Sequence, residues 1–156
     1  MENTEEILAL ASDAGRTLLE NGAEISRVED TMERIATYFG VSGEKFFVLS
    51  NGIFTTGKSY ANAEFIPMKG SRLDIVVAVN QLSRDIAAGR YSLQQARARL
   101  DELRRTPSKP DWELYLGAAL GCAGFCIIFG GSFLDCAASF VAALLLNLFV
   151  IKFSNR

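Results

Sequence analysis

The feature that most constrains this 156-residue chain is a long apolar stretch toward its C-terminal end. From Trp112 to Ile151 there is no Lys or Arg, and only Gly131-Ser132 divides the stretch into two runs. As helices, Trp112–Gly130 and Phe133–Ile151 would each extend about 28 Å, close to the roughly 30 Å hydrocarbon core of a bilayer. A buried hairpin in a soluble protein is the less favoured alternative. We therefore expect a transmembrane helical hairpin that follows a soluble head.

The distribution of basic residues predicts the orientation of this hairpin. Every Lys and Arg lies in residues 1–109 or at Lys152 and Arg156. Because positively charged flanks stay in the cytoplasm, both ends of the hairpin should be cytoplasmic and Gly131-Ser132 should lie outside. The acidic N-terminus has no apolar core before Ile7, so we expect no secretory signal and a cytosolic head.

Residues 1–107 show first helical, then strand-like, then helical periodicity, which predicts an α+β head with a small antiparallel sheet. Helices are expected up to Asn21-Gly22, from about 23 to 39, from 73 to 88, and after the capping box Ser92-x-x-Gln95. Lys45–Leu49 and Ile53–Thr56 flank Ser50-Asn51-Gly52, where Asn-Gly favours a two-residue type I′ turn. Ala63–Met68 should be a third strand, placed at an edge by Pro67. The predicted domains are 1–107 and the hairpin 108–153, with spans at about 112–130 and 133–151.

The composition argues against several kinds of site. The chain has no histidine, which excludes Ser-His-Asp chemistry and His-ligated zinc. No phosphate-binding glycine loop follows a strand, and a net charge of −2 does not indicate a nucleic-acid-binding surface. Cys122 and Cys126 have the spacing of a metal-ligand pair, but no third ligand accompanies them, so we interpret them and Cys136 as small packing residues. We expect a protein that is not an enzyme and needs no metal or cofactor.

The densest group of charged residues in the head lies on the second predicted helix. Glu24/Arg27 and Asp30/Arg34 have the spacing of helical ion pairs, and Glu29 and Glu33 lie among them. Such residues usually form an exposed ion lattice. A functional role is the alternative.

A polar stripe runs along the second apolar helix. Asp135, Ser139, Ala143 and Asn147 recur every four residues, opposite a leucine-rich side. Polar groups in hydrocarbon are costly, so this side should face other helices or a pathway. Asn147 fits either interpretation. Asp135 fits a capping box with Ser132 or an ion relay, and capping is the favoured alternative.

Small residues on the first apolar helix predict close helix packing. Gly117-x-x-x-Gly121 is a small-xxx-small motif, and a second small-residue row lies beside it. A lone hairpin does not need two such rows, which indicates helices outside this hairpin and an oligomer. The segment Arg84–Lys109 carries seven basic and three acidic residues. This excess fits a solvated helix face or attraction to anionic lipid of the bilayer.

The segment Leu18–Met32 contains Asn21-Gly22-Ala23-Glu24 and Arg27-Val28-Glu29. With Gly52-Ile53-Phe54, Asn80-x-Leu82-x-Arg84 and Phe129-Gly130-Gly131, it resembles the threonine/serine exporter family (ThrE-like, including YjjP-type subunits). The resemblance covers nearly the whole chain.

The resemblance implies a component of an inner-membrane exporter that moves threonine, serine or related small metabolites outward with the proton gradient. It also makes Glu24, Arg27 and Glu29 candidates for a functional or gating role. Two helices cannot enclose a pathway, so the chain is expected to be a fragment or one piece of a larger assembly. The alternative function is a membrane-anchored ligand-sensing or scaffolding domain. A hydrolase using the carboxylates of the second helix is the weakest hypothesis.

Overall fold

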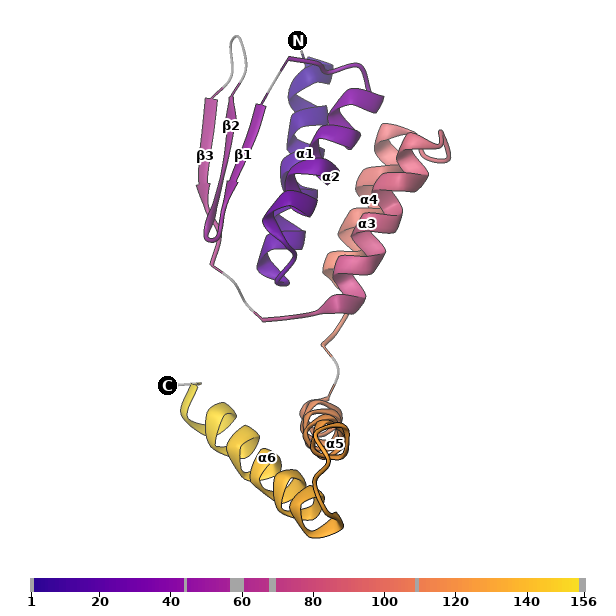
Figure 1. Cartoon of the computed structure of the whole chain (residues 1–156). Helices are drawn as coiled ribbons and strands as arrows, with labels where there is room; N and C mark the ends of the chain where they lie inside the picture. Colours follow the sequence, from indigo (N-terminus) through magenta and orange to yellow (C-terminus); the bar gives the residue numbers. More distant parts are fainter. Residues whose placement is uncertain (1, 44, 57–60, 68–69, 109, 155–156) are drawn as a thin grey trace. The chain divides into compact units, whose positions relative to one another are not determined.

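The computed structural model describes residues 2–43, 45–56, 61–67, 70–108 and 110–154. These residues form two compact units, Met1–Thr106 and Pro107–Arg156. The first unit, the head, contains four helices and a three-stranded sheet, and the second contains two helices (Figure 1). The observed helices and antiparallel sheet confirm the expected α+β composition of the head.

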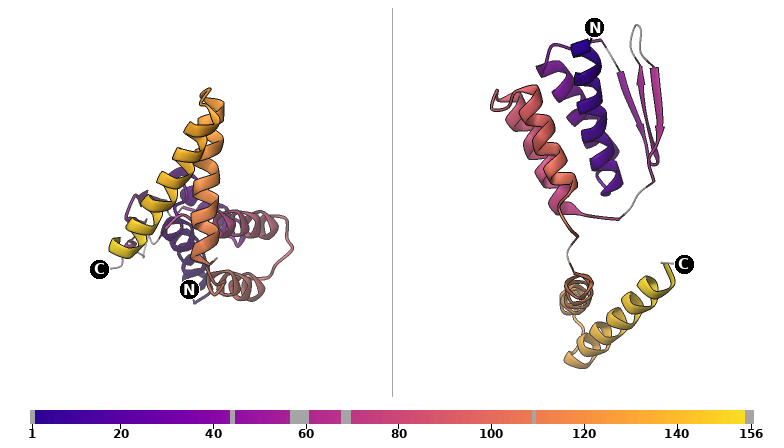
Figure 2. Two further views of the ribbon diagram at one scale, coloured as in Figure 1. Left: turned by 90° about the horizontal axis from the view of Figure 1, so that it is seen from below. Right: turned by 180° about the vertical axis from the view of Figure 1, so that it is seen from behind.

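The head is built in three layers. Its helices are α1 (Glu2–Glu20), α2 (Ile25–Tyr38), α3 (Leu73–Ala87) and α4 (Leu93–Arg104). Helices α1 and α2 form the middle layer, between the sheet and the α3–α4 pair (Figures 1 and 2).

The apolar faces of these helices form the core between the layers. Leu8, Val28, Val79 and Leu100, one from each helix, are at most 1% exposed. The helical spacing of Ile25, Val28 and Met32 predicts an inward side chain at Ile25, but Ile25 is 39% exposed because it lies in the first turn of α2, beyond the main core. The capping box of Ser92 and Gln95 is present at the start of α4, as expected.

The sheet has the order β1-β2-β3, with β1 at Lys45–Leu49, β2 at Gly52–Thr56 and β3 at Ala61–Phe65. Both pairings are antiparallel, and β3 lies at an edge as predicted. The predicted bounds of this strand were wrong, since it ends before Pro67; Met68 lies outside the described residues.

The turn between β1 and β2 differs from the expected type I′ turn. Leu49 pairs with Gly52, so Ser50 and Asn51 are the two turn residues. No described non-glycine residue has a positive φ, and a type I′ turn needs positive φ at both central positions. Gly52 is required for another reason: a Cβ there would lie 2.9 Å from the backbone oxygen of Glu64 on β3.

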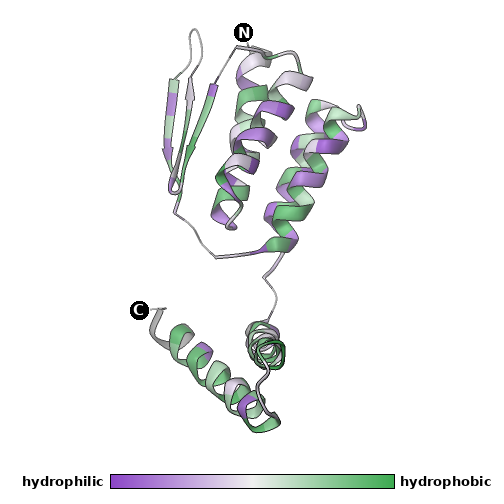
Figure 3. Ribbon diagram, viewed as in Figure 1, coloured by the Kyte–Doolittle hydropathy of each residue, from purple (hydrophilic) through white to green (hydrophobic). Residues whose placement is uncertain are grey.

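The second unit is a helical hairpin of α5 (Asp111–Ile128) and α6 (Phe133–Ser154) packed against each other. Both helices are predominantly hydrophobic (Figure 3). Only Phe133–Val150 of α6 is long and apolar enough for a membrane span among the described residues, with a mean hydropathy of 2.1. The apolar part of α5, Trp112–Ile128, is shorter than the predicted 112–130 because α5 ends at Ile128. The hairpin is therefore observed as two helices, one of which is a clear span candidate.

Candidate functional site

The turn between α1 and α2 places the Asn-Gly-Ala-Glu motif beside the sheet. Gly22 adopts φ +79°, and the Gly22 and Ala23 amides donate to the carbonyls of Leu19 and Leu18. This glycine-terminated helix end satisfies carbonyls that α1 would otherwise leave unpaired. Glu24 then occupies the N-cap position of α2, where its carbonyl accepts from the amides of Arg27 and Val28.

The three charged residues of the motif have different environments. Glu24 and Arg27 form an ion pair of 3.7 Å, with side chains 72% and 66% exposed. Glu29 is half-buried, and its Oε1 accepts a 2.8 Å hydrogen bond from the Val48 amide on β1. Glu29 therefore links α2 to the sheet, while the Glu24–Arg27 pair remains at the surface.

Glu24 and Glu29 line a common hollow of about 630 Å³ at the start of α2. Its wall includes the side chains of Leu19, Ile25 and Ser26, together with Ser50 from the β1–β2 turn. The hollow is mainly apolar, with the two carboxylates and two hydroxyls as its polar groups. Arg27 adjoins it through its ion pair with Glu24. The structure thus brings two of the three predicted head residues into one site.

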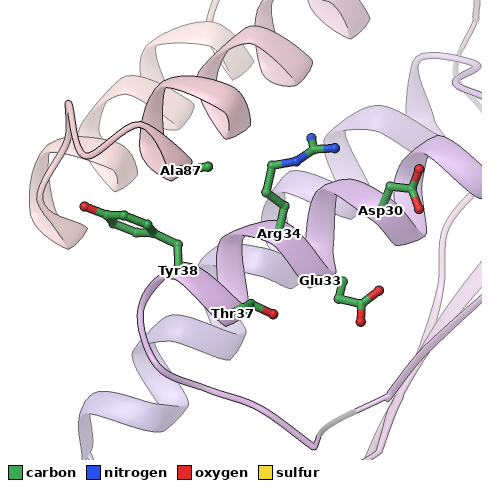
Figure 4. Close-up of a pocket in the computed structure, with 6 residues that line it drawn as sticks. All are labelled: Asp30, Glu33, Arg34, Thr37, Tyr38 and Ala87. Atoms are coloured by element: carbon green, nitrogen blue, oxygen red, sulfur yellow. The ribbon is translucent and has the colours of Figure 1, made fainter.

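A second hollow, of about 590 Å³, lies between α2 and the end of α3 (Figure 4). In Figure 4 the Arg34 side chain extends along the opening, with the side chains of Asp30 and Glu33 on α2 and of Tyr38 at the helix end around it. All of its lining residues except Arg34 are exposed. A small molecule would keep much of its surface in water there, whereas ligand sites usually enclose most of it. The hollow at the start of α2 is also open, but its lining includes the buried Leu19 and the half-buried Ala23 and Glu29, so it is the better candidate.

A polar network between α2 and α3 was missed by the sequence reasoning. Thr31 Oγ1 donates to Asn80 Oδ1 at 3.0 Å, and Asn80 Nδ2 donates to the Val76 carbonyl. Arg34 Nη1 donates to Ser83 Oγ at 2.9 Å, and Ser83 in turn donates to the Asn80 carbonyl. The available signal was that Thr31, Asn80 and Ser83 occupy core-facing positions of their helices, where a polar residue requires a partner.

Several basic residues of Arg84–Lys109 form ion pairs within the head. Four of the seven form ion pairs: Arg90 with Asp85, Arg97 and Arg104 with Asp13, and Arg99 with Glu102. Asp13 lies on α1, so two of these pairs join α4 to α1. Asp85 and Glu102 already belong to the segment, so only Asp13 reduces its positive excess, and both interpretations of this excess stay predictions.

In the hairpin, Asp135 occupies the capping position that was favoured for it. Its Oδ2 accepts from the Ser132 hydroxyl at 2.7 Å and from the Ser132 amide at 2.9 Å. Asn147 Nδ2 donates to the Ala143 carbonyl of its own helix. Ala143 is 7% exposed, and Ser139 and Asn147 are half-buried, so this part of the stripe faces α5.

Gly117 and Gly121 are exposed on α5. A Cβ at either position would have no neighbour within 4 Å. These glycines therefore do not pack against α6, and the prediction that they pack against another helix stays a prediction. Among the described residues, no group of three or more His, Cys, Asp and Glu side chains could hold a metal ion.

Comparison with protein families decides the membership of this chain. Residues 9–156 match the ThrE family, described as "Putative threonine/serine exporter". The chain belongs to the threonine/serine exporter family. No curated protein and no solved structure matches it. In this exporter-family chain the match includes the α2 motif, the α2–α3 polar network and the whole hairpin.

Proposed function

We propose that this chain is a component of a membrane exporter that moves threonine, serine or related small metabolites outward, driven by the proton gradient. The observation that carries the proposal is the exporter-family match over residues 9–156, which includes both the head and the hairpin. In this proposal the head is cytosolic, both termini of this chain are cytoplasmic, and the protein lies in the inner membrane. Catalysis is not part of the proposed role.

The proposal includes a membrane crossing by α5 as well as α6. Trp112–Ile128 extends about 26 Å at 1.5 Å per residue, a few ångströms less than the hydrocarbon core. A mismatch of this size is accommodated by local thinning of the bilayer. Large apolar side chains at Leu116, Leu120 and Phe125 are exposed in the unit, which suits contact with lipid or with other helices. Trp112 lies where an aromatic interface anchor is expected.

Export requires more helices than this hairpin provides. Two helices cannot surround a solute, so the proposed pathway forms with further transmembrane helices, from a longer chain or from partner subunits. The half-buried polar side of α6, with Ser139 and Asn147, is the part of this chain that we assign to that pathway or to its helix contacts. The exposed Gly117–Gly121 face of α5 is a second surface for such helices.

One observation favours a second candidate function. The hollow lined by Glu24 and Glu29 lies in the head, away from the polar residues of α6 along the chain. A membrane-anchored ligand-sensing or scaffolding domain would use such a site and would use the hairpin only as an anchor. Export would depend on Asn147 in or beside the pathway, whereas an anchored sensor would not depend on it.

The test is efflux of labelled threonine and serine from preloaded cells that express the complete assembly. We expect Asn147→Leu to reduce the efflux rate at least fivefold, and a protonophore to abolish wild-type efflux. Leu148→Ala, which changes a 53% exposed neighbour on the same helix, is the matched control and should keep wild-type efflux. Full efflux in Asn147→Leu at equal protein abundance would remove Asn147 from the pathway and favour the anchored-sensor function.

A further inference from the structure

The sheet of the head is apolar on both faces, although helices cover only one of them. Its inner face carries Val48 and Ile53, each 3% exposed, against the helices. We call the other side the outer sheet face; it consists of Phe47, Leu49, Phe54 and Phe65. Their exposed fractions are 60%, 40%, 40% and 71%. No described element of the head lies over this face (Figures 1 and 2).

The strand register makes these four side chains one continuous surface. Phe47 on β1 lies opposite Phe54 on β2, with ring centroids 6.4 Å apart. Leu49 on β1 and Phe65 on β3 lie on the same face in the neighbouring cross-strand row, with Gly52 of β2 between them. A sheet that is apolar on both sides is usually covered on both sides, because each exposed aromatic ring would otherwise remain in water.

We propose that the outer sheet face is an interface between two copies of this chain, in which the two sheets pack face to face about a two-fold axis. The contact would resemble a β-sandwich, with outward side chains of both sheets interdigitating. A two-fold interface uses the same patch on both copies, so it requires no second, complementary surface. The pairing goes beyond the exporter function and holds whichever solute the assembly moves.

The area of the patch suits such a pair. At about 200 Å² per aromatic side chain, the exposed fractions leave about 400 Å² of apolar surface on each copy. Two copies then contribute about 800 Å², which is the apolar share of a stable interface of roughly 1,200–1,600 Å² in total. A patch of this size is at the scale that marks interaction sites on soluble domains.

The charge of the face favours a second copy over an anionic lipid surface. Among the outward positions of the three strands, Lys45 is the only charged residue, and it lies at the end of the sheet away from the β1–β2 turn. With the strands of the two copies antiparallel, the two Lys45 side chains lie at opposite ends and do not repel. Attraction to an anionic lipid surface draws on several basic residues, which this face does not provide.

The test is cross-linking in native membranes with the full chain. Phe54→Cys is introduced after Cys122, Cys126 and Cys136 are changed to Ser, and a short bismaleimide is added. We expect a product at twice the mass of the chain. Adding Phe47→Ser and Phe65→Ser should reduce the product at least fivefold. Adding Leu73→Ser and Val77→Ser, which change residues 67% and 63% exposed on α3, should leave its yield unchanged.

The serine variants are chosen so that folding does not determine the result. Phe47 and Phe65 are mostly exposed within one copy, and the thermal unfolding of both double variants in detergent should match that of the parent. Three results would overturn the proposal: no product, a product with the mass of this chain plus another protein, or a yield that the Phe47 and Phe65 substitutions do not change. The second result would assign the face to a different partner.

Discussion

Glu29, a residue of the family motif, contributes to the fold by linking α2 to β1. Its carboxylate holds the Val48 amide of β1 at 2.8 Å, and hydrogen bonds to charged groups contribute about 1.5–3 kcal/mol when they are well shielded. Because Glu29 is only half-buried, we expect Glu29→Ala to destabilise the attachment of β1 by about 1–2 kcal/mol. Hydrogen exchange of the Val48 amide in the full chain measures this, and Glu29→Gln, which keeps an acceptor, should have the smaller effect.

The same two variants separate a structural role of Glu29 from a gating role. If Glu29 acts only through Val48, Glu29→Gln should keep most of the efflux. A loss of efflux in Glu29→Gln with near-normal exchange at Val48 would show that the charge itself is needed. Glu24→Ala is the comparison on the same motif: it breaks an exposed pair, and we expect a stability change within about 0.5 kcal/mol.

Gly52 gives a second prediction at the residue scale. A Cβ at this position would meet the Glu64 carbonyl oxygen at 2.9 Å, and a backbone atom in a strand pair cannot move aside without displacing β3. We expect Gly52→Ala to cost about 1–3 kcal/mol, seen as faster hydrogen exchange in β2 and β3. Asn51→Ala is the control and should change stability by less than about 0.5 kcal/mol. A larger cost for Asn51→Ala would contradict the observed turn and restore the expected type I′ turn.

At the scale of elements, the sequence predicted the helices better than the strands. Helical periodicity located α1, α3 and α4, because several apolar residues recur on one side of each helix. The strands are only five residues long, so a shift of one residue in β2 changes the turn, and β3 begins two residues and ends three residues earlier than predicted. The Asn-Gly pair marked the hairpin correctly, but the close approach of β3 to Gly52 depends on a contact distant in sequence.

The candidate site could be predicted only in part, because some of its contacts join residues that are distant in sequence. The charged residues of α2 were found from their spacing and from the family resemblance. The participation of Ser50 and the hydrogen bond from Val48 depend on how the sheet packs against α2. The Thr31–Asn80 bond joins residues 49 positions apart, and spacing within one helix does not reveal it.

The start of α3 and the end of α4 are joined through Arg72. Its guanidinium donates to Asp74 Oδ2 at 2.7 Å and to the Thr106 carbonyl at 2.9 Å. Hydrogen bonding from Arg72 lowers the pKa of the Asp74 carboxyl below its ordinary value of 3.8. A lowered folded-state pKa stabilises the fold above the unfolded-state value, and this contribution disappears as the pH falls through the folded-state value.

We therefore expect Asp74→Asn to be slightly less stable than the wild type at pH 7, by less than about 1 kcal/mol since the pair is partly exposed. The difference should shrink below about pH 4 and vanish at lower pH, where the wild-type carboxyl is protonated. Urea unfolding of the full chain in detergent at several pH values measures this. A difference that stays constant down to pH 2 would show that the Asp74 charge is not the cause.

At the scale of the whole molecule, the arrangement of the chain in the membrane depends on whether α5 crosses it. The basic residues on both sides of the hairpin favour cytoplasmic ends, which requires two crossings. If α5 lay along the membrane surface instead, α6 would be the single span and Ser132, just before it, would remain on the side of the head. The position of Ser132 therefore distinguishes the two topologies.

We expect Ser132→Cys, in a variant with Cys122, Cys126 and Cys136 changed to Ser, to react with a membrane-impermeant maleimide in spheroplasts, whose inner membrane is intact. Glu5→Cys in the same background is the matched control; it is exposed on the head and should react only after permeabilisation. Reaction at both positions only after permeabilisation would place Ser132 with the head and exclude α5 as a span. Labelling of Ser132→Cys alone in intact spheroplasts would establish the two-span hairpin, because a chain whose head is inside can expose this turn only if α5 crosses.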